Sequence, residues 1–137
     1  MIDRWRGQPA PLRVVVLLFV VALAYGTVVH LVQLVTSGGN PYPGLPTWLS
    51  AYFVSLTVLD PLAAVLLARR HRAGVVLTVA VLVTDATANA MANYAYDPTA
   101  AVTAGRIGQA VITCLALGAL AAAPAMWRAA RTGHRTA

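Results

Sequence analysis

The 137-residue chain contains neither lysine nor glutamate, and only 10% of its residues carry a charge. A soluble domain ordinarily carries about 25% charged residues, which cover its surface toward water. With 59% hydrophobic residues, this chain lacks the charge for such a surface. The composition therefore excludes a disordered chain, a nucleic-acid-binding module and an ordinary soluble enzyme, and it indicates an integral membrane protein.

Cysteine and histidine are also scarce. The single cysteine, Cys114, lies inside an apolar run, so the chain forms no intramolecular disulfide and has no CxxC redox pair. Only His30 of the three histidines lies within an apolar run, which excludes a haem held by two intramembrane histidines. Zinc-ligand spacings, P-loop and Rossmann glycine patterns and the GxSxG motif are absent. We therefore assign no metal ligand, cofactor or catalytic residue.

Four long apolar runs dominate what is present. A helix needs roughly 20 apolar residues to cross the hydrocarbon core of a bilayer. Runs of that length cover residues 12–35, 48–68, 74–94 and 102–126. The first run is longer than the roughly 7–15 residues of a signal-peptide core, and no small-residue cleavage site follows it. We predict an all-α four-helix transmembrane bundle that forms a single domain over residues 1–137.

The arginines predict the orientation of this bundle. Nine of the ten lie before or at the start of the first span, join the second to the third, or follow the fourth, and only Arg106 lies on the other side. The positive-inside rule then places both termini in the cytoplasm. Because the Ala, Val and Arg content suggests a GC-rich bacterial genome, we expect the inner (plasma) membrane. Trp5, Trp48, Trp127 and Tyr42 fall at the predicted interfaces, as in an aromatic belt.

Membrane lipid is one expected partner, since anionic headgroups attract arginine. The basic tail after Trp127 is the segment that would lie along such lipid. We interpret this tail as a topology signal rather than as a specific lipid site.

Ionisable side chains inside the spans are the first functional candidates. An ionisable group near the middle of a bilayer costs ~2.5–3.5 kcal/mol on insertion scales, so it is seldom kept without a role. His30, Asp60 and Asp85 meet this description. Asp60 precedes Pro61, so its side chain either satisfies backbone groups opened by the proline or belongs to a site. Asp85 lies near the middle of its span, where it is either protonated or paired with His30 or Arg106.

Polar side chains recur at helical spacing in the outer halves of three spans. These stripes comprise His30 and Gln33 in the first span, Asp85, Asn89 and Asn93 in the third, and Arg106, Gln109 and Thr113 in the fourth. Residues three or four apart share one helix face, so a bundle that buries these faces together holds a polar pocket. The predicted ligand-binding residues are His30, Gln33, Asp60, Asp85, Asn89, Asn93 and Gln109.

A structural role is the alternative for each amide, because Asn, Gln and Thr in membrane helices form interhelical hydrogen bonds worth about 0.6–2 kcal/mol. For Arg106 we expect a side chain that reaches outward to the headgroups.

The second span opens with a Pro-Thr-Trp sequence at 46–48 and is interrupted by Pro61. Together with His30 and Gln33 toward the end of the first span, this arrangement resembles the EXPERA group, four-span membrane proteins that include emopamil-binding sterol isomerase and the sigma-2 receptor. The resemblance implies cytoplasmic termini and a ligand cavity within the bundle. The chain has no glutamate, the residue that the group's sites use, and its first outer loop is shorter. The resemblance thus favours a lipophilic cavity over sterol isomerisation.

These observations predict a non-enzymatic binder of a small lipophilic or amphiphilic ligand. The alternative is an accessory or assembly subunit whose polar stripes, with Gly105, Gly108 and Gly118, contact a helical membrane partner or a second copy of the chain. An EXPERA-like isomerase or a proton-coupled transporter using Asp60 and Asp85 ranks last, because four spans leave little room for alternating access. We expect no nucleic-acid partner.

Overall fold

Four long helices make up the molecule. The computed structural model describes residues 2–38, 41–97, 99 and 101–132. Its helices are α1 (Ala10–Thr36), α2 (Thr47–Ala68), α3 (Arg72–Met91) and α4 (Ala104–Thr132), with a 3₁₀ turn at Ile2–Trp5 and a π-helical turn at Ala92–Tyr96 that continues α3. Each helix is long and apolar enough to cross a membrane, and the described residues contain no strand. The prediction of an all-α chain with four helices that are able to span a membrane is confirmed for the described residues.

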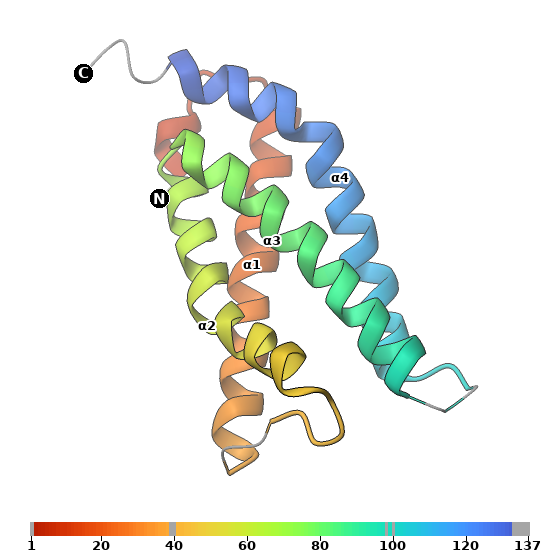
Figure 1. Cartoon of the computed structure of the whole chain (residues 1–137). Helices are drawn as coiled ribbons and strands as arrows, with labels where there is room; N and C mark the ends of the chain where they lie inside the picture. Colours follow the sequence, from red (N-terminus) through yellow and green to blue (C-terminus); the bar gives the residue numbers. More distant parts are fainter. Residues whose placement is uncertain (1, 39–40, 98, 100, 133–137) are drawn as a thin grey trace.

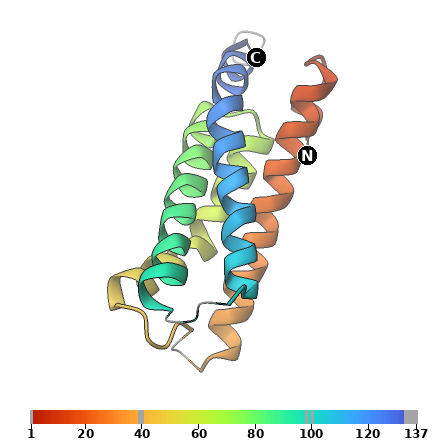
Figure 2. The same ribbon diagram turned by 90° about the vertical axis from the view of Figure 1, so that its right-hand side faces the viewer.

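Consecutive helices run in opposite directions, so the chain begins and finishes at the same end of the bundle (Figures 1 and 2). We call this the terminal end; it also contains the turn between α2 and α3. The opposite, loop end contains the connections between α1 and α2 and between α3 and α4. Each helix has extensive contacts with the next helix in the sequence, whereas α1 and α4 have fewer contacts with each other. The α1–α2 pair and the α3–α4 pair diverge toward the loop end (Figure 1).

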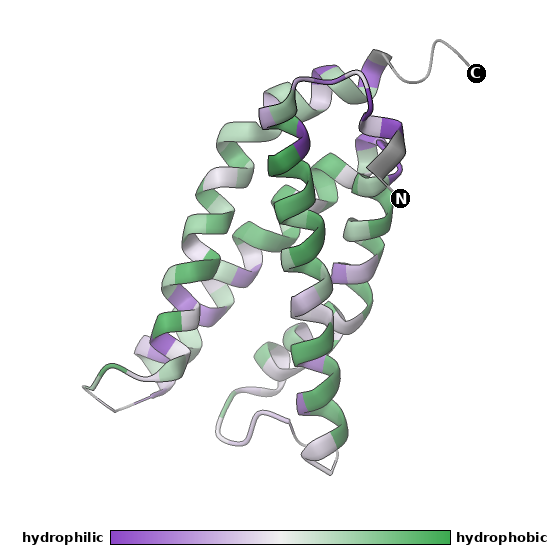
Figure 3. Cartoon of the chain, turned by 180° about the vertical axis from the view of Figure 1, so that it is seen from behind, coloured by the Kyte–Doolittle hydropathy of each residue, from purple (hydrophilic) through white to green (hydrophobic). Residues whose placement is uncertain are grey.

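The helix surfaces suit a bilayer. Hydrophobic residues cover the middle of the helices, and hydrophilic ones gather toward their ends (Figure 3). In α1 only Val16, Phe19 and Leu23 are buried, although the helix is 27 residues long. Within α-helices all backbone groups bond internally, so lipid can cover the remaining apolar side chains without an unpaired polar group.

The turn between α2 and α3 is unusually tight. Arg70 has a positive φ of 61°, a conformation that normally favours glycine. Its N–H donates to the Leu67 carbonyl, and the His71 N–H donates to the Leu66 carbonyl, both at 2.9 Å. A helix that ends with a residue in the left-handed conformation is closed by this pair of hydrogen bonds. Gly74 then packs on the end of α2, since a β-carbon there would lie 2.7 Å from the Leu66 carbonyl oxygen.

The Arg70 side chain joins three segments at the terminal end. Its Nε donates to the Ala129 carbonyl at 2.8 Å, and its Nη1 donates to the Arg4 carbonyl at 3.1 Å. Trp5, which is fully buried, donates its indole N–H to the Leu67 carbonyl at 3.0 Å. Hydrogen bonds from a charged group contribute about 1.5–3 kcal/mol, enough to offset the roughly 1–2 kcal/mol cost of a left-handed residue.

Candidate functional site

Two of the predicted ligand residues meet at the loop end through a tyrosine. The Tyr42 hydroxyl donates to Gln33 Oε1 at 2.7 Å and lies 2.9 Å from His30 Nδ1. Because the hydroxyl hydrogen is used by Gln33, His30 Nδ1 must be the donor of the second bond, which leaves Nε2 as an acceptor when the ring is neutral. The Phe53 ring packs 4.9 Å from the Tyr42 ring and 6.1 Å from the His30 ring, between ring centroids.

The surroundings of Tyr42 raise the pKa of its hydroxyl group, which provides a test of this cluster. Burial, and secondly the charge of Asp85, raise the pKa of Tyr42 from 10.0 to about 12. The folded protein thus holds this proton more tightly than the unfolded chain. The free energy of unfolding should be at its full value below pH 10 and fall as the pH rises from 10 toward about 12. Thermal unfolding followed by circular dichroism over this range should show the decline.

The matched control is Tyr42→Phe, which keeps the ring and removes the titrating hydroxyl. This variant should lose a measurable part of the alkaline decline in stability. The same pH dependence in both proteins would show that Tyr42 is not the group responsible.

The predicted stripe on α3 forms a ladder of its own. Asn89 Nδ2 donates to Asp85 Oδ1 at 2.8 Å and to the Asp85 carbonyl at 3.1 Å. Asn93 Nδ2 donates in turn to the Asn89 carbonyl at 2.9 Å. The partner of the Asp85 carboxyl group is therefore Asn89, rather than His30 or Arg106. The side-chain amide groups of Asn89 and Asn93 donate hydrogen bonds along their own helix. The atoms that they present to neighbouring helices are therefore mainly oxygens.

Gln109 connects α4 to α3. Only 8% of this residue is exposed, and its Nε2 donates to the Ala86 carbonyl at 3.0 Å and to Thr113 Oγ1 at 2.9 Å. Its Oε1 is buried without a hydrogen-bond partner among the described residues. Gln109 thus forms the interhelical bond of the structural alternative while leaving one acceptor unused.

Arg106 folds back onto the protein. Its guanidinium donates to the carbonyls of Ala101 at 3.1 Å and Asn93 at 3.4 Å, and also to that of Thr99. Its Cζ lies 5.1 Å from the centre of the Tyr94 ring. The expected reach toward headgroups is replaced by closure of the α3–α4 connection, because the guanidinium bonds carbonyls before and within that connection.

Asp60 is the most isolated polar residue of the predicted set. It is 5% exposed, and no described residue forms a hydrogen bond with its carboxyl group. Its Oδ2 lies 2.5 Å from where a β-carbon on Gly26 would stand, so the carboxyl group packs on the α1 backbone at a glycine. No bond to the backbone around Pro61 supports the repair interpretation. A buried charge without a partner is costly, so Asp60 requires a proton or an outside donor.

The structure thus places the seven predicted residues in three neighbouring groups rather than in one ring. His30 and Gln33 meet at Tyr42. Gln109 of α4 bonds the Ala86 carbonyl of α3, next in sequence to Asp85 of the ladder. Asp60 lies between α1 and α2. The charge of Asp85 contributes, after burial, to the raised pKa of Tyr42. Tyr52, which bonds Thr84 at 2.7 Å, also joins α2 to α3 beside Asp85. Its spacing of eight residues before Asp60 on the same helix face is the signal that would have identified it.

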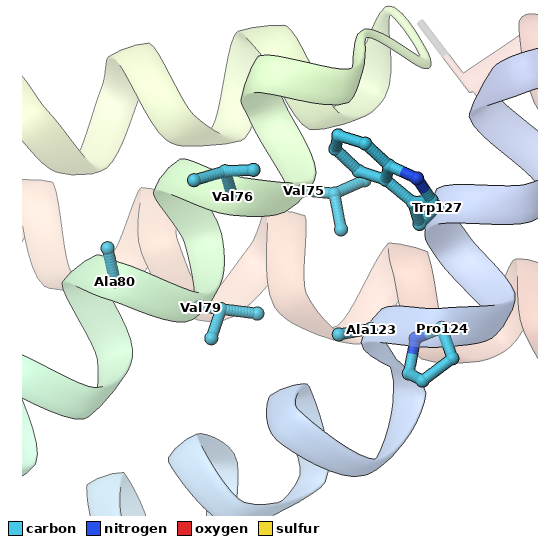
Figure 4. Close-up of a pocket in the computed structure, with 7 residues that line it drawn as sticks. All are labelled: Val75, Val76, Val79, Ala80, Ala123, Pro124 and Trp127. Atoms are coloured by element: carbon cyan, nitrogen blue, oxygen red, sulfur yellow. The ribbon is translucent and has the colours of Figure 1, made fainter.

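A pocket of about 490 Å³ lies elsewhere, between α3 and α4 toward the terminal end (Figure 4). Its lining consists of Val75, Val76, Val79, Ala80, Ala123, Pro124 and Trp127. None of the seven predicted ligand residues lines it, so the polar site and this apolar pocket are separate features.

Comparisons with protein-family models, curated proteins and solved structures gave no match for this chain. The resemblance to the EXPERA group therefore stays a prediction. Within the described ranges, no group of three or more His, Cys, Asp or Glu side chains is placed to hold a metal ion.

Proposed function

We propose that the protein is a non-enzymatic binder of a small amphiphile whose polar head carries a hydrogen-bond donor, in the first place a protonated amine. The observation that carries this proposal is Asp60, a residue that is only 5% exposed and whose carboxyl group forms no hydrogen bond with any described residue. Buried polar groups in proteins normally have a partner. A ligand that enters the bilayer region of the bundle can supply it.

The unused groups favour an amine over other head groups. The Asn89 and Gln109 side-chain nitrogens already donate within the bundle. Among the seven predicted ligand residues, Gln109 Oε1 and the Asp60 carboxyl group form no hydrogen bond with a described residue, and both can accept one. The rings of Tyr42 and Phe53 add faces that attract cations and cover alkyl chains. An acceptor-rich, aromatic environment complements an alkylammonium head with an apolar tail.

Two ligands that differ only in the head group test the proposal. In an uncharged detergent near neutral pH, wild-type protein should bind dodecylamine roughly tenfold or more tightly than dodecanol, because a charge-assisted hydrogen bond contributes about 1.5–3 kcal/mol. Asp97→Asn is the matched control: Asp97 is also an aspartate, but it lies outside the spans and already accepts a hydrogen bond from the Thr99 N–H at 2.9 Å. It should keep the amine preference.

Equal affinities for the amine and the alcohol would contradict the proposal. A partner protein that co-purifies, with neither ligand bound, would instead favour the assembly subunit.

We also propose that both termini lie in the cytoplasm and that the bundle resides in the inner membrane of a bacterium. The support is that every arginine in the described part of the chain except Arg106 lies at the terminal end. Arg135 lies outside the described residues. Because positive residues are retained on the cytoplasmic side, the loop end should face outward.

Site-directed labelling tests this orientation. In a Cys114→Ala background, Pro43→Cys at the loop end and Ala10→Cys at the terminal end each place one thiol at an exposed position. A membrane-impermeant maleimide should label Pro43→Cys in intact spheroplasts and Ala10→Cys only after the membrane is opened. The reverse pattern would invert the proposed topology.

A further inference from the structure

The apolar pocket between α3 and α4 forms a groove that opens sideways. Its 490 Å³ fall within the roughly 300–1,000 Å³ of ordinary ligand sites. Val76 is 57% exposed, and Ala80 and Pro124 are exposed as well. In a membrane the open side of the groove faces lipid. Small side chains at Ala80 and Ala123 create the space, and the Trp127 ring bounds it toward the terminal end (Figure 4).

Two arginines stand over this end of the groove. The Arg72 guanidinium carbon lies 4.9 Å from the centre of the Trp127 ring, and that of Arg131 lies 5.8 Å from it. Arg72 Nε is buried and has no hydrogen-bond partner among the described residues. Two positive groups, one with an unused donor, are thus held on one aromatic ring at the mouth of an apolar groove.

We propose that this groove binds one acyl chain of an anionic phospholipid, with the phosphate held by Arg72 and Arg131. Arginine matches phosphate oxygens with parallel N–H donors. Basic pockets between membrane helices recognise anionic headgroups in this way. Tryptophan suits the boundary between headgroup and chain. The tail that carries Arg131 therefore has a binding role besides its topology signal. This site is distinct from Asp60 and does not rest on the amphiphile proposal.

Native mass spectrometry from an uncharged detergent tests the proposal with two lipids that share their acyl chains. Wild-type protein should retain phosphatidylglycerol roughly tenfold more strongly than phosphatidylcholine. Arg72→Gln should remove most of that preference. Arg128→Gln is the matched control, because Arg128 is exposed on the same helix one residue from Trp127. It should retain the preference.

A second variant tests the groove itself. Val76→Trp fills the open side from a position that is 57% exposed, so helix packing is preserved, and it should weaken binding of both lipids. A second measurement uses the wild-type protein alone. At equimolar lipid, phosphatidylglycerol with brominated chains should quench the tryptophan fluorescence more than phosphatidylcholine with brominated chains.

Several outcomes would overturn the proposal: equal retention or equal quenching by the two lipids, an equal loss in Arg128→Gln, or unchanged binding in Val76→Trp. A lipid-independent dimer in place of lipid adducts would assign the groove to a second copy of the chain and would also overturn it.

Discussion

Replacing Gly74 by alanine is expected to lower the free energy of unfolding by about 2–3 kcal/mol. The added β-carbon would lie 2.7 Å from the Leu66 carbonyl oxygen and still closer to the Leu66 carbonyl carbon and the Leu67 nitrogen. These are backbone atoms, so no side-chain rotation relieves the overlap. The turn that holds them is itself closed by the Arg70 and His71 hydrogen bonds.

Gly108→Ala is the matched control for this prediction. Gly108 is also helical, but a β-carbon there would meet nothing within 4 Å. Alanine has the higher helix propensity, so this variant should keep or gain up to about 1 kcal/mol. Unfolding in detergent, followed by circular dichroism, compares the two. Equal stabilities would show that the α2–α3 turn adapts to a β-carbon, contrary to its geometry.

Asp60→Asn should change stability and ligand binding in opposite directions. The substitution keeps the shape of the side chain and removes a buried ionisable group that no described residue pairs. We expect the free energy of unfolding to rise by about 1 kcal/mol, because a buried unpaired group no longer carries charge. Affinity for dodecylamine should fall roughly tenfold or more, to that for dodecanol.

Asp85→Ala provides the contrast. It removes the acceptor of the 2.8 Å bond from Asn89, so it should lower the free energy of unfolding by about 1 kcal/mol. Thermal unfolding and titration with dodecylamine of both variants measure the changes in stability and in ligand affinity. If Asp60→Asn is less stable than wild type and binds amine as before, Asp60 is a structural residue and the proposed ligand head lies elsewhere.

The fold was predictable because long apolar runs and the placement of the arginines independently indicate the same arrangement. Each span is an apolar run of more than twenty residues, and breaker residues separate them. The end at which the arginines gather is also visible in the sequence. The tight α2–α3 turn was not predictable, because it places an arginine where glycine is usual. That choice depends on carbonyls of Arg4 and Ala129, which only the folded chain brings close.

The candidate site was predictable only in part. Helical spacing identified the α3 ladder of Asp85, Asn89 and Asn93, since i, i+4 neighbours must meet. The spacing of residues along one helix does not show which helix it faces, so the contact of Asp60 with Gly26 could not be predicted. Tyr42 was assigned to an interfacial belt, because the path of a loop is set by tertiary contacts. The groove at Trp127 exists because small side chains line it, and small side chains leave no periodic pattern in the sequence.

The bonds at the terminal end have a consequence for biosynthesis. Trp5 emerges from the ribosome before its carbonyl partner on Leu67, which lies 62 residues later in the chain. The N-terminal segment therefore has no docking place until the second span is made. The Ala129 carbonyl, 59 residues beyond Arg70, is made only when most of α4 has been synthesised. Closure of this end therefore follows the synthesis of all four helices, and a chain truncated before Ala129 would leave Arg70 without one of its carbonyl partners.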